Sequence, residues 1–218
     1  MTPLSPTARA VGGPGGTGAS PPLDERARIH FARAKDGRVR AFLALDFDEP
    51  LRARLAEALQ RLQHEVADVR WLSPETIHLT LRFLGASTPE GLDRLSTGVE
   101  RAASSCPPCE ARVQGIGFFP SHGPARVIWA GLALPPEVQQ LQAECERAAV
   151  AAGFAPEGRA FRPHVTLGRW RDRVRRPAAP TLDLGATRLG PVTLFKSDLR
   201  PQGALHTPLR TFPLGGLG

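Results

Sequence analysis

The chain has 218 residues, of which 41% are apolar and 22% are charged, and its formal net charge is +7. This composition is typical of a globular protein with enough apolar surface to bury a real core. No apolar run approaches the ~18 residues of a membrane span, and Pro and Gly occupy the place of a signal peptide's apolar segment. We therefore expect a soluble, cytoplasmic protein.

The positive charge is concentrated near the N-terminus. Residues 1–40 hold seven Arg or Lys against three acids, a net charge of +4, which leaves +3 for the remaining residues. Net charge therefore supports a polyanionic partner only mildly. Residues 1–37 contain Gly-rich and Pro-rich stretches with almost no apolar periodicity, so we expect a disordered N-terminal extension with at most a short helix over 24–34.

Ordered structure is expected from Arg38 onward, as one domain over 38–218. Val39–Phe47 has the apolar character of a buried strand, and the acids and Pro50 that follow it are typical of a helix start. Leucines then recur at helical spacing and give one apolar face. The first half continues with a strand over 69–72, a strand over 77–84, a helix from 88 to about 102 and a strand over 111–119.

The second half repeats the order of strand, helix and strand. A strand is predicted over 126–134, and Pro135, Pro136 and Glu137 open a helix that Gly153 ends. The next strand is predicted over 164–168. A basic, Pro-containing connection over 171–180 then leads to two final strands, over 189–198 and 204–212.

Three cysteines, an odd number without a secretory signal, argue against a disulfide framework. Cys106 and Cys109 have the CxxC spacing, but no second pair completes a zinc site. An incidental loop is therefore favoured over a metal or redox role. Cys145 lies on the apolar face of a predicted helix and is interpreted as a core residue.

One four-residue phrase, His-apolar-Thr-Leu, occurs twice, starting at His78 and at His164, 86 positions apart. The His and Thr stand two residues apart, which places both side chains on the same face of a strand. Each copy follows a strand and a helix, as an ancient duplication would leave it. We therefore predict an α+β, bilobal fold, with two pseudo-symmetric lobes that each contain an antiparallel sheet and packed helices, and with one motif on each wall of a cleft between them.

A pair of histidines facing one phosphorus atom suits acid/base chemistry. An imidazole with a pKa of about 6.5 both accepts and donates a proton near neutral pH, and in-line displacement needs one group on each side of the phosphorus. The hydroxyls of Thr80 and Thr166 are placed to donate to phosphate oxygens. By strand alternation Arg82 and Arg162 share the faces of the two motifs, where each is either a phosphate contact or part of a surface ion pair.

Other interpretations of the histidines exist. A single copy of the phrase would favour a hydrogen-bonded core histidine beside a β-branched threonine, whereas two matched copies favour a functional pair. A role of His78 and His164 as metal ligands lacks a convincing carboxylate or cysteine partner, so we expect no metal at this pair. For His64, His122 and His206 we expect ordinary conformational or surface roles.

The sequence resembles the 2H phosphoesterase superfamily, named for two His-x-Thr motifs, and is most similar to bacterial and archaeal RNA 2′,3′-cyclic phosphodiesterases, historically called 2′-5′ RNA ligases. The resemblance implies a bilobal α+β fold and opening of a 2′,3′-cyclic phosphate at an RNA 3′ end or on a nucleoside to a 2′-phosphate. Some members of the family also join such an end to a 5′-hydroxyl, and the resemblance implies neither a metal nor a nucleotide cofactor for the hydrolysis. The matching segments are 41–46, 69–72, 78–85, 126–131, 161–169 and 194–199.

The resemblance also implies roles for individual residues, with His78 and His164 as proton donor and acceptor and the two motif threonines as phosphate ligands. Phe42 and Arg169 match family positions linked to base stacking and phosphate binding. His206 stands where the family has an aromatic residue, often Tyr. The expected partners are RNA 3′ ends or nucleotides with a cyclic phosphate, bound by a monomer without membrane contact. The alternative is a nucleotide- or RNA-end-binding module of the same fold with little catalytic activity.

Overall fold

The computed structural model describes residues 37–200 and 203–215. The expectations of a disordered extension over 1–37 and of a short helix over 24–34 fall, apart from Gly37, outside the described residues. The described elements are β1 (Val39–Phe47), α1 (Glu49–Glu65), β2 (Val69–Trp71), the 3₁₀ helix η1 (Pro74–Thr76), β3 (Leu79–Ser87), α2 (Pro89–Ser104), β4 (Glu110–Phe119), β5 (Ala125–Ala133), α3 (Pro136–Ala151), β6 (His164–Val174), β7 (Asp183–Arg200) and β8 (Gly203–Phe212).

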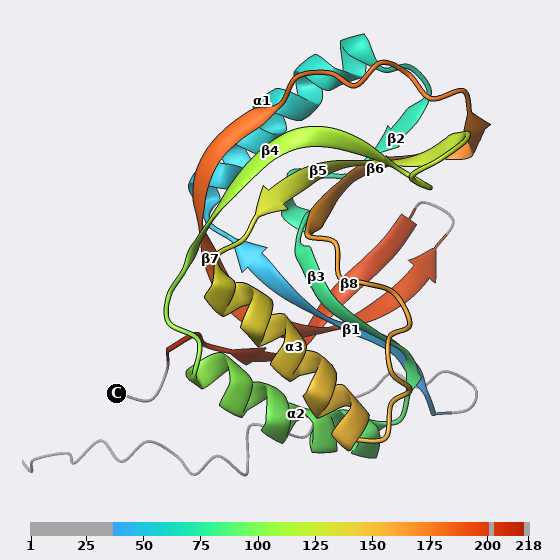
Figure 1. Cartoon of the computed structure of the whole chain (residues 1–218). Coiled ribbons are helices and arrows are strands. Elements are labelled where there is room, and N and C mark those ends of the chain that lie inside the picture. The colour runs from blue at the N-terminus through green and yellow to red at the C-terminus, as the bar shows by residue number, and fades with distance from the viewer. Residues whose placement is uncertain (1–36, 201–202, 216–218) are drawn as a thin grey trace, which may run out of the picture. The chain divides into compact units, whose positions relative to one another are not determined.

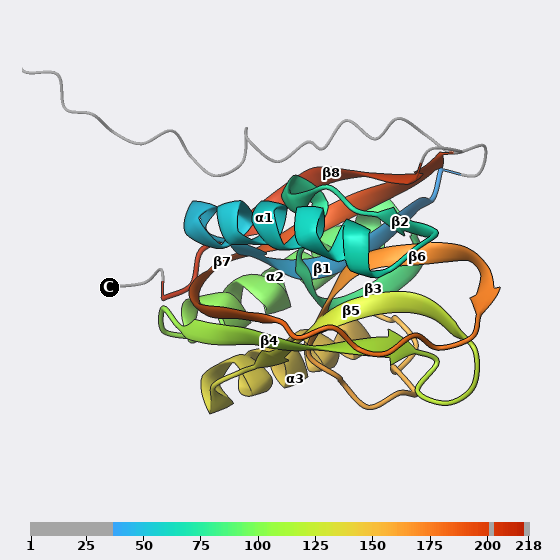
Figure 2. The ribbon, with the colours of Figure 1, turned by 90° about the horizontal axis from the view of Figure 1, so that it is seen from above.

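The strands form an antiparallel sheet in the order β2-β6-β5-β4-β7-β1-β3, with β8 also paired to β7 (Figure 1). The long strand β7 pairs with β4 through its first residues and with β1 and β8 through the rest. It therefore joins a first half-sheet, β3-β1-β7-β8, to a second half-sheet, β2-β6-β5-β4-β7. The sheet curves strongly (Figure 2), so that β3 and β6, which stand near opposite ends of the strand order, contact each other.

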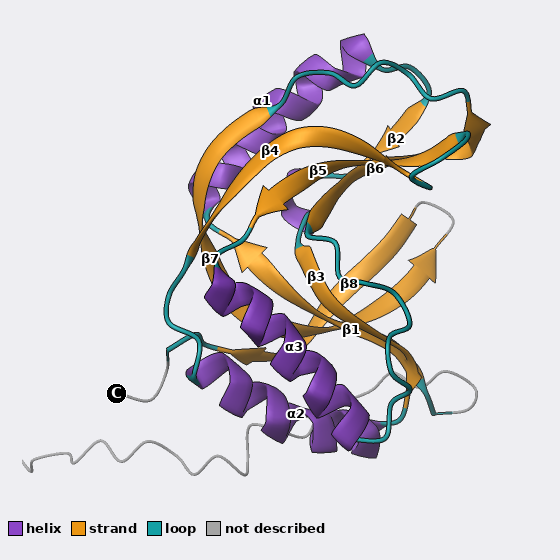
Figure 3. Ribbon diagram, viewed as in Figure 1, coloured by secondary structure: helices purple, strands orange, loops and turns teal. Residues whose placement is uncertain are grey.

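Helices α1 and α3 each pack on the half-sheet opposite to the one that contains the preceding strand. Helix α1 follows β1 of the first half-sheet but packs against β2 and β7, and Arg54 and Arg61 of α1 donate hydrogen bonds to the carbonyls of Ala186 and Thr181. Helix α3 follows β5 of the second half-sheet but packs against β3 and α2 (Figure 3). The predicted bilobal α+β fold is confirmed, and the two halves of the chain interlock within it.

The start of α1 shows how the sequence specifies these elements. The Asp48 carboxylate accepts a hydrogen bond from the Leu51 amide (2.9 Å) and caps the helix, and Pro50 occupies its first turn, as predicted. The same carboxylate accepts hydrogen bonds from the Thr187 hydroxyl (2.9 Å) and the Arg188 amide (3.1 Å). The cap therefore also fixes the helix to β7.

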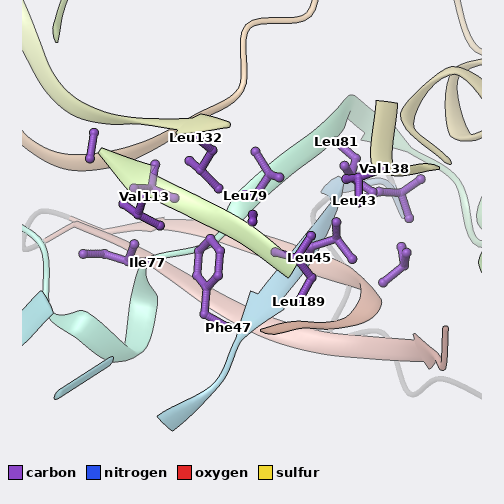
Figure 4. Packing of buried hydrophobic residues seen from close by; sticks show 14 of the residues in the cluster. Leu43, Leu45, Phe47, Ile77, Leu79, Leu81, Val113, Leu132, Val138 and Leu189 are labelled. Atoms are coloured by element: carbon purple, nitrogen blue, oxygen red, sulfur yellow. The ribbon is translucent and has the colours of Figure 1, made fainter. Parts of the chain in front are cut away.

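The core is formed by apolar side chains from both half-sheets, which point toward one another in Figure 4. Leu43 and Leu45 of β1, Leu79 of β3 and Val113 of β4 are fully buried, and Cys145 of α3 is buried as predicted. Truncation of such a leucine to alanine typically costs about 2–5 kcal/mol of stability. Among the described helices, none has the length and apolar character needed to cross a membrane.

Two strands are longer than predicted. The strand expected over 164–168 continues to Val174 as β6, and the strand expected over 189–198 extends over Asp183–Arg200 as β7. The charged and Pro-containing sequence between them lacks an apolar pattern. Pairing of Val174 with Ala125 and of the first residues of β7 with β4 nevertheless extends both strands, because partners distant in the sequence satisfy the backbone hydrogen bonds.

Candidate active site

The two motif histidines occupy equivalent positions at the start of their strands. His164 is the first residue of β6, and His78 immediately precedes β3. Nδ1 of His78 lies 2.9 Å from the Thr76 carbonyl oxygen, and Nδ1 of His164 lies 2.7 Å from that of Arg162. A carbonyl only accepts, so each Nδ1 carries the proton and donates it to this bond. Each neutral ring therefore keeps a free lone pair on Nε2, ready to accept a proton.

The fold brings the two histidines within electrostatic range of each other. Strands β3 and β6 contact each other, and the charge of His164 acts on the ionisation of His78. Burial, followed by the positive charges of His206, Arg52 and His164, lowers the pKa of His78 from 6.5 to about 4, against the opposing effect of the bond to the Thr76 carbonyl. His78 is therefore neutral near pH 7 in the free protein.

His164 has a more open environment. Burial lowers its pKa, the bond to the Arg162 carbonyl opposes this effect, and the nearby Arg169 guanidinium lowers the pKa further. Both imidazoles therefore favour the neutral form before a ligand binds. A phosphate anion placed between them would raise the pKa of each ring and allow one of them to take up a proton.

Each motif strand carries a β-bulge at the last leucine of the motif. On β3, Leu81 is the extra residue between Thr80 and Arg82, which pair with successive residues of β1. On β6, Leu167 is the extra residue after Thr166. A bulge places two residues of one strand opposite one residue of its partner, so the side chains that follow change faces. This shared irregularity decides which residues reach the site.

Arg82 is directed away from the site. Its side chain is only 7% exposed, and its guanidinium forms ion pairs with Glu146 of α3 and with Glu157 (3.8 Å) and donates to the carbonyls of Phe83 and Ala155. The prediction that Arg82 shares the face of the first motif is therefore wrong, because the bulge reverses the alternation. Arg82 instead ties α3 and the loop after it to β3.

The other two candidate arginines lie near the second motif. Arg169 follows the bulge of β6 and pairs with Val127 of β5, and its charge reaches His164. Arg162 is exposed just before β6, and its guanidinium donates to the Ser121 hydroxyl (3.4 Å) of the β4–β5 connection. The Arg169 charge thus acts on the His164 ring, whereas the Arg162 side chain reaches the β4–β5 connection.

Aromatic rings hold both histidines. His78 stacks on Phe42 with ring centroids 4.9 Å apart, and Phe42 stacks in turn on Phe195 at 5.3 Å. His164 lies edge-to-face with Phe119 at 4.9 Å and with Trp129 at 5.9 Å. Edge-to-face and offset-stacked contacts of this kind fix ring orientation as well as burying apolar area.

Phe42 does not have the exposure that base stacking requires. Its side chain is 3% exposed, because His78 and Phe195 stack on it. The structure therefore contradicts the expected contact of Phe42 with a base and gives it the role of a support for His78. The exposed ring nearby is that of Phe83, which is 60% exposed and lies 6.0 Å from Phe42. Sequence reasoning missed Phe83, because simple alternation from Thr80 places it on the wrong face.

The motif threonines are half-buried and available to a ligand. In the part of the chain that the structure describes, neither Thr80 nor Thr166 gives its hydroxyl to a protein partner. Within the same residues, no group of three or more His, Cys, Asp or Glu side chains comes together as a metal site. The three cysteines are free thiols, and burial raises the pKa of Cys106 and of Cys145 to about 12.

The fold and the paired motifs define a two-histidine phosphoesterase. The family model for LigT-like phosphoesterases matches residues 45–129 and 132–206, so the chain belongs to this family. It is 33% identical over 184 residues to an RNA 2′,3′-cyclic phosphodiesterase of Methanothermobacter thermautotrophicus, covering 81% of this chain and 100% of that protein. It is 35% identical over 192 residues to one of Thermus thermophilus, covering 82% and 91%.

Solved structures agree with this assignment. A crystal structure of a Thermus thermophilus protein matches with a TM-score of 0.71 at 28% identity, over 81% of this chain and 98% of that one. The structure of E. coli LigT complexed with 3′-AMP matches with a TM-score of 0.68 at 26% identity, again over 81% and 98%. The resemblance inferred from the sequence is therefore confirmed.

Proposed function

We propose that the protein hydrolyses the 2′,3′-cyclic phosphate of an RNA 3′ end or a nucleoside to a 2′-phosphate, using His78 and His164 as an acid/base pair. The observation that carries this proposal is the matched pair of imidazoles, each with Nδ1 committed to a carbonyl and Nε2 free, in one site with two threonine hydroxyls. The names of the curated relatives, RNA 2′,3′-cyclic phosphodiesterases, support the same substrate.

In the proposed reaction, one neutral imidazole accepts a proton through Nε2 from the attacking water as the new bond to phosphorus forms. The other imidazole, protonated once the phosphate anion is bound, donates its proton to the 3′-oxygen as the bond from phosphorus to that oxygen breaks. The two histidines then hold the same total number of protons as before. They supply both proton transfers, so the step needs neither a metal nor a nucleotide cofactor.

The remaining groups would bind the substrate. The hydroxyls of Thr80 and Thr166 donate to the non-bridging phosphate oxygens, where negative charge develops. The Arg169 guanidinium adds a positive charge on the side of His164. The exposed ring of Phe83 offers a face for the terminal base on the side of His78. With a 5′-hydroxyl in place of water as the nucleophile, the same step would break the bond from phosphorus to the 3′-oxygen and join two RNA ends through a 2′-5′ linkage.

The test uses purified protein with 2′,3′-cyclic AMP or a cyclic-phosphate RNA in buffer containing EDTA. We expect turnover to a 2′-phosphate, and we expect His78→Ala and His164→Ala each to lose most of it. His122→Ala, at an exposed histidine on the β4–β5 connection, is the matched control and should keep full activity. Tight binding of a 2′-phosphorylated nucleotide without any turnover would instead identify a binding module.

A further inference from the structure

A third histidine lies against the site. The ring of His206, on β8, meets His78 edge-to-face with centroids 5.4 Å apart and at 85°. It also meets Phe42 at 4.9 Å and Phe195 at 6.5 Å. His206 thus places a titratable imidazole ring among aromatic rings. The proposed reaction assigns it no proton transfer.

The strand register fixes this placement. His206 pairs with Ser197 of β7, two residues beyond Phe195, so it lies on the face of the sheet that carries Phe42 and His78. Lys196 and Asp198 flank Ser197 and form an ion pair with each other (3.1 Å), and strand alternation directs them to the opposite face. Neither of them therefore provides a counter-charge for His206.

The surroundings of His206 oppose a second positive charge. Its Nδ1 atom is buried and has no hydrogen-bond partner among the described residues. Burial lowers the pKa of His206. A proton added there would leave a buried donor unsatisfied, at the edge of rings that offer no acceptor.

The charged and titratable groups that act on His78 are all basic. Among residues 37–200 and 203–215 they are His206 from β8, His164 from β6 and Arg52 from α1, whereas β1 and β7 contribute phenylalanine rings to the surroundings of His78. Arg52 donates to the Pro74 carbonyl (3.0 Å) and lies 3.7 Å from the Asp46 carboxylate, which partly neutralises it. His206 is the one of the three whose ring contacts His78.

We propose that His206 is a positioning residue that sets the charge of His78, because the two contacting rings carry at most one positive charge between them over the working pH range. Each ring then titrates as a member of a pair rather than independently. The proton state of His78 depends on whether residue 206 can be charged. An aromatic residue at this position would keep the packing and lose this control.

The test is the titration of the Hε1 proton signals of His78 and His206 by NMR, on the wild-type full chain. We expect both signals to move in two steps, each ring reporting the protonation of the other. In His206→Phe, which keeps an aromatic ring, and in His206→Gln, the midpoint of His78 should rise by about one pH unit, because a neighbouring positive charge is removed. His122→Phe is the matched control and should leave the midpoint unchanged.

The activity profile gives a second readout, which rests on the proposed function. In the pH profile of kcat/KM, the limb that reports the ionisation of His78 should move to higher pH in His206→Phe and in His206→Gln. The shift should equal that of the NMR midpoint, whether His78 acts as the acid or as the base. Independent one-step titrations of the two rings in the wild-type protein would overturn the proposal, as would an unchanged His78 midpoint in both variants. The NMR titration tests the coupling of the two rings even if the protein hydrolyses no cyclic phosphate. If a variant fails to fold, the wild-type titration alone tests the coupling.

Discussion

The burial of His78 makes the stability of the protein depend on pH, and His78→Phe isolates this effect. The folded state holds the pKa of His78 at about 4, against 6.5 for the free side chain. Between these values the unfolded chain binds the extra proton, so unfolding becomes easier as the pH falls. At about 1.4 kcal/mol per pH unit, the contribution lost by pH 4.5 is about 2–3 kcal/mol. Phenylalanine can stack on Phe42 in the same place without titrating.

The assay is equilibrium unfolding in urea at pH 7.5 and at pH 4.5, for the wild type and the variant. Carboxylates also titrate in this range and affect both proteins alike, so the difference between the two proteins reports His78. We expect the stability lost on acidification to be smaller in His78→Phe by about 2–3 kcal/mol. His64→Phe, at an exposed position of α1, should lose as much stability as the wild type. Equal losses in His78→Phe and the wild type would refute the burial argument.

Three further predictions concern packing and substrate contact. In Gly117→Ala the new methyl group would overlap the Trp129 ring that packs on His164, so we expect about 1–3 kcal/mol of destabilisation and a lower kcat. The control is Gly158→Ala, which has open space around it and should match the wild type in unfolding and kinetics. Arg82→Leu should lower the free energy of unfolding in urea by about 3 kcal/mol, because Glu146 stays partly buried without its partner. Adding Glu146→Leu should restore much of the lost stability, and a double variant as unstable as the single one would contradict the ion-pair account. Phe83→Ala should raise KM about tenfold for a cyclic nucleotide with little change in melting temperature, and an unchanged KM would exclude the Phe83 ring as the base contact.

Much of the fold was predictable because local signals specify it. The Asp48 cap, the Pro50 that follows it and the leucine spacing predicted α1, and alternating apolar runs predicted most strands. The length of β7 was not predictable, since its first residues, apart from Leu184, are charged, polar or small and become a strand by pairing with β4. The exchange of helices between the half-sheets is likewise a property of tertiary packing that no local window contains.

The candidate site also has a part that the sequence predicted and a part that it did not. The repeated phrase indicated His78 and His164, and the strand period indicated that each threonine accompanies its histidine. The bulges at Leu81 and Leu167 depend on the partner strands, so alternation alone misplaced the arginine that follows the first motif. The rings around each histidine come from β1, β4, β5, β7 and β8 and were not visible as a group in the sequence.

The central claim is that His78 and His164 act as one acid/base pair, and a double-mutant cycle on kcat tests it most directly. We expect His78→Ala and His164→Ala each to lower kcat for a 2′,3′-cyclic nucleotide by about 10²–10⁴. Because groups that act as a unit are not additive, the double variant should be no slower than the slower of the two single variants. A double variant whose loss equals the product of the two single losses would show that the histidines act independently and would contradict the account.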